Sequence, residues 1–339
     1  GANPHGGGEN PHAKPAPPAP PTGGGPIPSS FKVVGTTGEA APAFAAEGTE
    51  IMRELERWRG LPFTSDLVVE FREPTEDGPA GWYEPDTKRL VVTLKGSARF
   101  GRGTMLHEMF HALQDQQFDL LAAHAKVEGD ADAERALQAV IEGEAMLAVQ
   151  ELMDYDFAQH TKLPAEGALN EDRFEKVFHY GQGLQFVLAV RSAKGWDGVG
   201  ELFRAPPRAT SLILHPERYL EGGAAPPAVA PPALGDEGEV LERATQGAQA
   251  LRLFLARSPA TRGAADALAA SLQADERLRT RTSAGEAHAW AFTFASPEAA
   301  LDFAAAAPVA LRRLPELEGR LPARVSCVVE GRAVVLRWR

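Results

Sequence analysis

The stretch Thr104-Met-Leu-His107-Glu108-Met-Phe-His111-Ala-Leu-Gln-Asp115 contains the pattern H-E-x-x-H within a chain of 339 residues. Residues four positions apart on a helix lie one above the other, so His107 and His111 can offer two imidazoles to one metal ion. Glu108 is rotated by about 100° from His107, which places it beside the metal, where a general base takes a proton from water. The other positions are mostly apolar, so we expect a buried helix whose polar groups need a neutralising partner such as zinc.

A third metal ligand is expected on the long helix predicted over 130–154 (DADAERALQAVIEGEAMLAVQELMD). Two Glu-Gly-x-Ala tetrads, beginning at Glu128 and Glu142, compete for this role. Glu128 stands at the helix entrance, where the helix dipole explains an acid equally well. Glu142 lies in mid-helix among apolar residues, where a carboxylate is unfavourable unless it is paired or coordinated. Gly143 weakens a helix by about 1 kcal/mol relative to alanine, which indicates close approach by another backbone or a substrate. We therefore predict Glu142, with Glu128 as the alternative.

Further polar residues have both a functional and a structural interpretation. Tyr180, on a helix predicted over 171–194, could donate to the oxyanion of a tetrahedral intermediate, or it could be a core tyrosine with a bonded hydroxyl. His215 either lines the cleft or caps a turn. Asp115 is placed to accept a hydrogen bond from a histidine ring nitrogen, or it is a solvated acid near the helix end. Glu144 points away from Glu142 and is predicted to be solvated.

Composition indicates a folded protein without affinity for polyanions. Hydrophobic residues make up 44% and charged residues 24% of the chain, as in globular proteins, and the formal net charge is −11. Because no basic run accompanies this charge, nucleic acid is excluded as an expected partner and anionic membrane surfaces are poor candidates. No apolar stretch has the length that crosses a bilayer. The single cysteine, Cys327, precludes an internal disulfide.

Changes in composition divide the chain into segments. Residues 1–30 are almost entirely Gly, Pro, Ala and small polar residues, which bury too little surface to fold, so we expect a disordered tether. Residues 31–222 are predicted to form the catalytic domain, and 223–237 (GAAPPAVAPPALGDE) a Pro/Ala linker. Residues 238–339 contain no metal-ligand spacing and no phosphate-binding loop. We expect a small α+β domain there, with a role in packing or substrate recognition.

The predicted elements give an α+β protein. In the first domain a helix over 49–59, a strand over 66–71 and a hairpin over 82–94 precede the metal helix. A zinc peptidase requires such strands, because an edge strand binds the substrate backbone beside the metal. The second domain is predicted to contain helices over 238–257 and 259–272, strands over 277–282 and 287–294, a helix over 297–306 and a closing hairpin over 324–337.

The assembled residues resemble a zincin metallopeptidase of the gluzincin type, which has H-E-x-x-H on one helix and a glutamate on a downstream helix. Glu142-Gly-Glu-Ala145 resembles the E-G-x-A around the third ligand of aminopeptidase-like gluzincins. More narrowly, the segments HEMFHALQDQQFDL, IEGEA, FHYGQGLQFV and LILHPERY are similar to those of a group of bacterial secreted or lipoprotein zinc peptidases. The chain departs from thermolysin-like enzymes in the longer spacing between His111 and Glu142.

This resemblance implies a zincin-like domain followed by a small α+β domain, and hydrolysis of peptide bonds in a peptide or protein substrate. The cofactor would be Zn²⁺, which leaves one coordination position for water. The residues predicted for the site are the zinc ligands His107, His111 and Glu142 and the catalytic residues Glu108, Tyr180 and His215.

The rival interpretation is a non-catalytic envelope binding protein on a zincin scaffold. The intact Glu108 argues against it, because a structural metal site has no use for a base. The sequence begins at Gly1 with a Gly/Pro-rich tether, as a bacterial lipoprotein does just after its lipidated cysteine. We therefore expect an extracytoplasmic location, with membrane attachment only through a lipidated N-terminus.

Overall fold

The structure is a computed structural model, and it describes residues 30–34, 41–72, 79, 81–93, 101–155, 157, 169–222, 230–233, 238–283, 285–314, 317, 322 and 324–339. Its helices and strands in chain order are β1 Phe31–Val34, α1 Ala41–Arg59, β2 Leu67–Arg72, β3 Gly81–Glu84, β4 Arg89–Thr93, α2 Arg102–Phe118, α3 Leu120–Ala125, α4 Ala131–Met153, α5 Glu171–Lys176, the π-helix Val177–Gln182, α6 Gly183–Arg204, α7 Thr210–Leu214, α8 Pro216–Leu220, β5 Glu239–Ala244, α9 Gly247–Ala256, α10 Pro259–Arg262, α11 Ala265–Ser271, β6 Leu272–Thr282, β7 Gly285–Phe294, α12 Pro297–Leu311, β8 Val325–Glu330 and β9 Ala333–Trp338.

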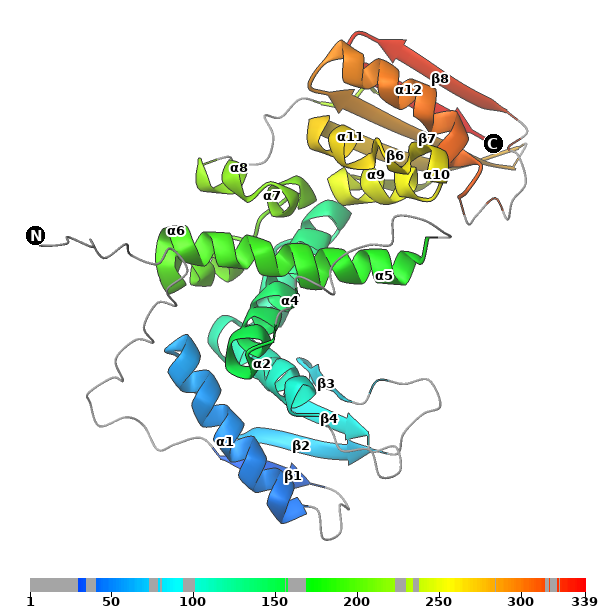
Figure 1. Ribbon diagram of the computed structural model, residues 1–339. Helices are drawn as coiled ribbons and strands as arrows, with labels where there is room; N and C mark the ends of the chain where they lie inside the picture. Colours follow the sequence, from blue (N-terminus) through cyan, green and yellow to red (C-terminus); the bar gives the residue numbers. More distant parts are fainter. Residues whose placement is uncertain are drawn as a thin grey trace, which may run out of the picture.

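A four-stranded sheet with the order β1-β2-β4-β3 lies at one end of the molecule, beside α1 and α2 (Figure 1). Strands β1, β2 and β4 are parallel, and β3 runs antiparallel to β4 at the edge. The predicted hairpin and the predicted strand before it are confirmed. Ile51 of α1 and Met109 of α2 share a buried apolar cluster with Leu67 and Leu90 of the sheet. This packing holds α2 against the edge strand β3.

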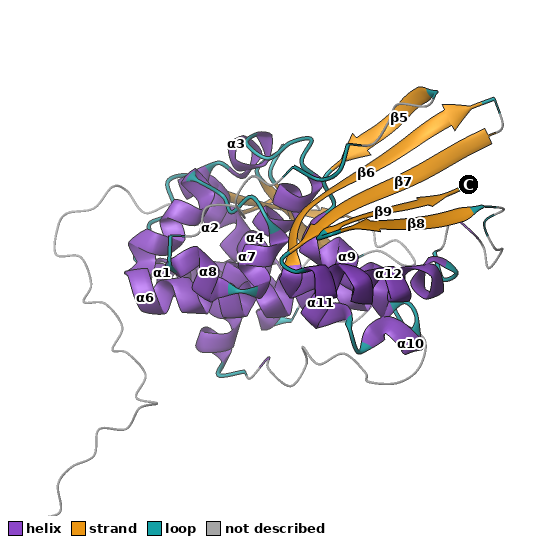
Figure 2. Cartoon of the chain, turned by 90° about the horizontal axis from the view of Figure 1, so that it is seen from above, coloured by secondary structure: helices purple, strands orange, loops and turns teal. Residues whose placement is uncertain are grey.

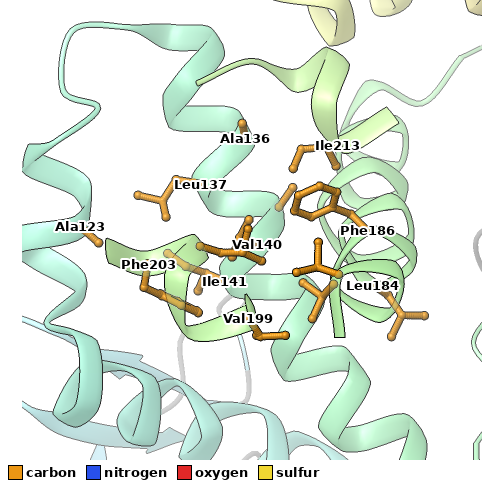
Figure 3. Packing of buried hydrophobic residues seen from close by; sticks show 14 of the residues in the cluster. Ala123, Ala136, Leu137, Val140, Ile141, Leu184, Phe186, Val199, Phe203 and Ile213 are labelled. Carbon is orange, nitrogen blue, oxygen red and sulfur yellow. The ribbon is translucent and has the colours of Figure 1, made fainter. Parts of the chain in front are cut away.

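Helix α4 is the central element, and apolar residues bury most of its length between α2 and α6. Figure 3 shows the apolar cluster that α4 forms with α6 and its neighbours, in which the labelled side chains are Ala123, Ala136, Leu137, Val140, Ile141, Leu184, Phe186, Val199, Phe203 and Ile213. A Cβ atom built on Gly143 of α4 would lie 2.2 Å from the carbonyl carbon of Gly183. The predicted close approach of another backbone at Gly143 is therefore confirmed.

A second sheet, entirely antiparallel and ordered β5-β6-β7-β9-β8, belongs to the C-terminal part of the chain. Figure 2 shows α9, α11 and α12 lying along one face of this sheet. The core beneath them is aromatic, with the rings of Phe292 and Phe303 4.4 Å apart and Phe254 beside them. With two small sheets and a helical majority, the predicted α+β class is confirmed.

Predicted helices are wrong in part of the second half. Glu239–Ala244 is strand β5, paired with β6, and the helix predicted over 238–257 begins only at Gly247. The strand pairs with residues more than thirty positions away, so local periodicity does not reveal it. The helix predicted over 259–272 is divided into α10 and α11 around Gly263.

Residues 238–339 pack directly on the first part of the chain. The guanidinium of Arg257 forms two hydrogen bonds of 2.6 and 2.9 Å with the carboxylate of Glu171. The backbone N–H of Gln249 donates to the Thr210 hydroxyl over 3.0 Å. Leu214 packs against both the apolar cluster of α4 and α6 and the core of the second sheet. These contacts fix the second sheet and its helices against the N-terminal end of α4.

The predicted tether over 1–30 and the predicted linker over 223–237 lie outside the described residues, apart from Ser30 and residues 230–233. Within the part of the chain that the structure describes, no helix combines the length and the apolar character needed to cross a bilayer.

Candidate metal centre

Helix α2 brings His107 and His111 together as their spacing predicts. Their Nε2 atoms lie 3.0 Å apart, and the ring centroids are separated by 4.5 Å with the planes almost perpendicular. Met105, Leu106 and Met109 on the same helix are completely buried, so α2 is held on several sides. The two imidazoles of α2 therefore point their Nε2 atoms toward one position.

Glu142 of α4 completes the cluster. Its Oε2 lies 3.0 Å from Nε2 of His107 and 3.4 Å from Nε2 of His111. All three side chains are only 11–12% exposed. Glu128 is exposed at the loop before α4 and takes no part in this group. Of the two competing glutamates, the structure brings Glu142 to the histidines.

The three ligand atoms fit a tetrahedral zinc site. Zinc bonds of about 2.05 Å in tetrahedral geometry place ligand atoms about 3.3 Å from one another. The distances of 3.0, 3.0 and 3.4 Å among the Nε2 and Oε2 atoms agree with this value. A set of two nitrogens and one oxygen, without a thiolate, is typical of catalytic sites that retain an open position.

The charges in the metal-free cluster are strongly coupled. Burial raises the pKa of Glu142, but hydrogen bonds from His107 and His111 outweigh burial and hold that pKa far below its usual range. Burial lowers the pKa of His111, and the bond and charge of Glu142 with the charge of Glu108 raise it to about 9. In the absence of a metal ion, a proton on His111 therefore balances the negative charge of Glu142. A divalent metal ion can take the place of that proton.

Glu108 lies beside the cluster rather than in it. Its Oε2 accepts a hydrogen bond of 3.1 Å from the backbone N–H of Tyr83 on the edge strand β3. The charge of Glu108 raises the pKa of both His111 and Tyr180, so its carboxylate lies near these rings. This is the position expected for a base beside the metal rather than for a ligand.

Tyr180 reaches the cluster from the π-helix. Its ring stacks on His107 with centroids 5.7 Å apart and planes inclined by 30°. Burial raises the pKa of Tyr180, as do the charges of Glu142 and Glu108 and a hydrogen bond to Glu142. The phenol therefore stays protonated and can donate a hydrogen bond. The π-helix interrupts the single α-helix predicted over 171–194. Short π-helical segments of this kind often occur at functional sites.

The neighbouring His179 is neutral. Burial lowers its pKa to about 4. Its Nε2 atom is buried and has no hydrogen-bond partner among the described residues. His179 also lines a cavity of about 580 Å³ together with Gln138 and Arg135. Gln138 connects this cavity with the histidine–glutamate cluster, because its amide donates to Oε1 of Glu142 over 2.8 Å.

His215 lies elsewhere. It occupies the junction of α7 and α8, where its Nδ1 is 3.3 Å from a carboxylate oxygen of Glu217. Within the described part of the chain, no hydrogen bond or ion pair joins it to the histidine–glutamate cluster. His215 is the residue before α8, but its side chain makes no capping hydrogen bond and pairs with Glu217 instead.

Asp115 does not orient a histidine, and it is not solvated. Only 3% of its surface is exposed. It accepts hydrogen bonds from the Tyr83 hydroxyl at 2.6 Å, the Lys88 ammonium at 2.9 Å and the backbone N–H of Leu120 at 3.1 Å. Both interpretations of this residue from sequence are wrong. Its role is to fasten the β3–β4 hairpin to the end of α2.

The prediction for Glu144 is also wrong. Its side chain is completely buried and forms an ion pair of 2.7 Å with Arg59 of α1. Helix α4 has no solvated face at this level because α1, α2 and α6 surround it. The residue that does orient a metal-ligand candidate is Gln114, whose amide oxygen lies 2.8 Å from Nδ1 of His111. Its position three residues after His111 is the one signal in the sequence that points to it.

Comparison with known proteins adds no assignment, because no protein-family model, curated protein or solved structure matches the chain.

Proposed function

We propose that the protein is a zinc-dependent peptidase of the gluzincin type, built on a zincin-like domain. The observation that carries this proposal is the convergence of His107, His111 and Glu142 with Glu108 beside them but outside the ligand set. A purely structural metal site would not need an acid in that place.

Zinc held by the three ligands would lower the pKa of a water molecule and polarise the scissile carbonyl. Glu108 would take the proton of the attacking water and deliver it to the leaving amine. One of its oxygens is already held by the N–H of Tyr83, which fixes the carboxylate for this transfer. The hydroxyl of Tyr180, kept protonated by burial and nearby carboxylates, would donate to the developing oxyanion.

The edge strand β3 gives a peptide substrate a place to bind. Among the described residues it pairs with β4 alone, and Glu108 contacts it from the side of the cluster. An extended peptide can add to such an edge by main-chain hydrogen bonds. The cavity of about 580 Å³ on the other side of Gln138 offers space for a substrate side chain.

The test combines metal analysis with a peptide-library digest. We expect about one zinc per chain, removable by a chelator, and cleavage of peptides by the zinc-loaded protein. Glu108→Gln should retain zinc and the bond from Tyr83, and it should lose turnover. Zinc binding without cleavage in the wild-type protein would instead support a non-catalytic binding protein on the same scaffold. Absence of zinc would refute the proposal.

A further inference from the structure

Gln114 is in the centre of a buried chain of hydrogen bonds behind the cluster of His107, His111 and Glu142. Its side chain is 1% exposed. The amide oxygen Oε1 lies 2.8 Å from Nδ1 of His111. The amide nitrogen Nε2 lies 3.0 Å from the backbone carbonyl of Ile141 and 2.9 Å from the carboxylate of Glu144. One amide thus connects the histidine of α2 with two groups of α4.

The partners of Gln114 determine which way its amide points. The Ile141 carbonyl and the Glu144 carboxylate are both acceptors, and the carboxylate is paired with Arg59. Each of them therefore takes one of the two N–H groups of the amide nitrogen. Turning the amide over would place its oxygen against two acceptors, so the Ile141 carbonyl and the second oxygen of Glu144 would lose this donor. The oxygen must therefore face His111.

An amide oxygen facing Nδ1 requires a proton on Nδ1, because that oxygen can only accept. A neutral His111 then carries its lone pair on Nε2, the atom that faces His107 and Glu142. We propose that Gln114, oriented by Glu144, is the positioning residue that fixes His111 in the metal-binding tautomer. This inference rests on the proposed metal site, but it concerns the metal affinity of the protein and not its substrate.

The Glu144–Arg59 ion pair secures the orientation of the amide. Glu144 is completely buried and Arg59 is 4% exposed, and Arg59 lies 4.4 Å from the ring centre of Trp196. Such an enclosed pair holds the carboxylate in one place with its second oxygen directed at Gln114. Glu144 thus orients the Gln114 amide, and the amide oxygen in turn holds a proton on Nδ1 of His111.

His107 provides an internal control. Its Nδ1 atom is buried and has no hydrogen-bond partner among the described residues. Changes at Gln114 or Glu144 should therefore act on Nδ1 of His111 and have no direct effect on Nδ1 of His107. A general loss of structure would affect both rings.

The experiment measures zinc dissociation constants by chelator competition for four variants, with thermal denaturation to show that each is folded. Gln114→Met fills the space without an acceptor and should weaken zinc binding about 10–100-fold. Glu144→Gln should weaken it as well, because two amide NH₂ groups then oppose each other and favour turning Gln114 over. Gln114→Glu alone places two carboxylates together and should also weaken binding.

The exchange variant Gln114→Glu/Glu144→Gln restores the order of donors and acceptors from His111 to Arg59 at unchanged net charge, but it leaves the Ile141 carbonyl without its donor. Glu at position 114 accepts from His111, and Gln at position 144 donates to it and accepts from Arg59. We expect this variant to bind zinc at least tenfold more tightly than Gln114→Glu, which lacks the same donor to the Ile141 carbonyl. A structural role alone predicts no such recovery, since the double change would then be as damaging as the two single changes together.

Nitrogen-15 NMR of the histidines gives the second reading. The Nδ1–H of His111 should be protected from exchange in the wild-type protein, with and without zinc, and exposed to exchange in Gln114→Met, while the exchange behaviour at Nδ1 of His107 stays unchanged. Zinc affinities within twofold of wild type in all variants, or a His111 ring without a proton on Nδ1, would overturn the inference and leave the peptidase proposal intact. A wild-type protein that takes up no zinc would refute the peptidase proposal, and the metal-free NMR signal would still decide whether Gln114 holds this ring.

Discussion

Gly143 and Gly183 meet backbone to backbone where α4 crosses the start of α6. A Cβ atom on Gly143 would lie 2.2 Å from the carbonyl carbon of Gly183, and one on Gly183 would lie 2.0 Å from the carbonyl oxygen of Ala139. Glu142 is adjacent to this crossing on α4, and Tyr180 lies one turn before it on the π-helix. The crossing therefore sets the distance between the carboxylate and the phenol.

Gly143→Ala should destabilise the protein and weaken zinc binding. Alanine is favoured over glycine by about 1 kcal/mol within a helix, so a lower melting temperature would report the forced separation of the two backbones. Gly200→Ala is the matched control, because its Cβ would meet only Arg204 and Phe118 side-chain atoms at 3.5 Å or more. The control should melt at or slightly above the wild-type temperature. Equal melting of both variants would show that the crossing tolerates a methyl group.

Glu142→Gln should weaken zinc binding by orders of magnitude, because it removes the charged ligand that lies within 3.4 Å of both histidines. Glu128→Gln changes an exposed acid outside the cluster and should leave the zinc content unchanged. Metal content after dialysis separates the two variants independently of activity. Retained zinc in Glu142→Gln would mean that the third ligand lies elsewhere.

Tyr180→Phe should lower kcat about 100-fold, the usual consequence of losing one oxyanion donor. The phenyl ring preserves the stacking on His107, so zinc affinity should stay within severalfold of wild type. Tyr219→Phe is the control, because that ring packs on Phe186 away from the cluster and should leave turnover unchanged. A loss of zinc as large as the loss of kcat would indicate that Tyr180 acts by holding Glu142.

Asp132 makes the stability of the protein depend on pH. Burial raises its pKa to about 7, and the charge of Asp275 adds to this, while two hydrogen bonds from Thr210 and the charge of Arg135 oppose it. An unfolded chain has an aspartate pKa near 4, so the folded protein holds one more proton between about pH 4 and 7. The free energy of unfolding should therefore fall as pH rises through this window, by up to about 1.4 kcal/mol per pH unit.

Asp132→Asn keeps an acceptor for the two bonds from Thr210 and cannot titrate. Urea unfolding of both proteins at pH 5, 6, 7 and 8 then gives the contribution of this carboxyl together with its coupling to Asp275. The stability of the wild type relative to the variant should decrease between pH 5 and 7. A constant difference across the series would show that the pKa of Asp132 is not raised.

Local pattern was sufficient for several parts of this protein. The i, i+4 spacing predicts the meeting of His107 and His111, since helix geometry alone stacks them. An acid in the middle of an apolar helix predicts that Glu142 has partners, because an isolated buried carboxylate is unfavourable. Gly143 likewise predicts the contact that Gly183 makes. In each case the physical rule acts within a few residues of chain.

Only the tertiary structure decides which buried partner each remaining polar group has. Asp115 and Gln114 are neighbours on one helix, yet Asp115 fastens a hairpin and Gln114 orients His111. Glu144 finds its cation, Arg59, 85 positions away on α1. The sequence determines that such groups need partners, because burial without a hydrogen bond is costly. The packing of α1, α2 and α4 determines which partners they find.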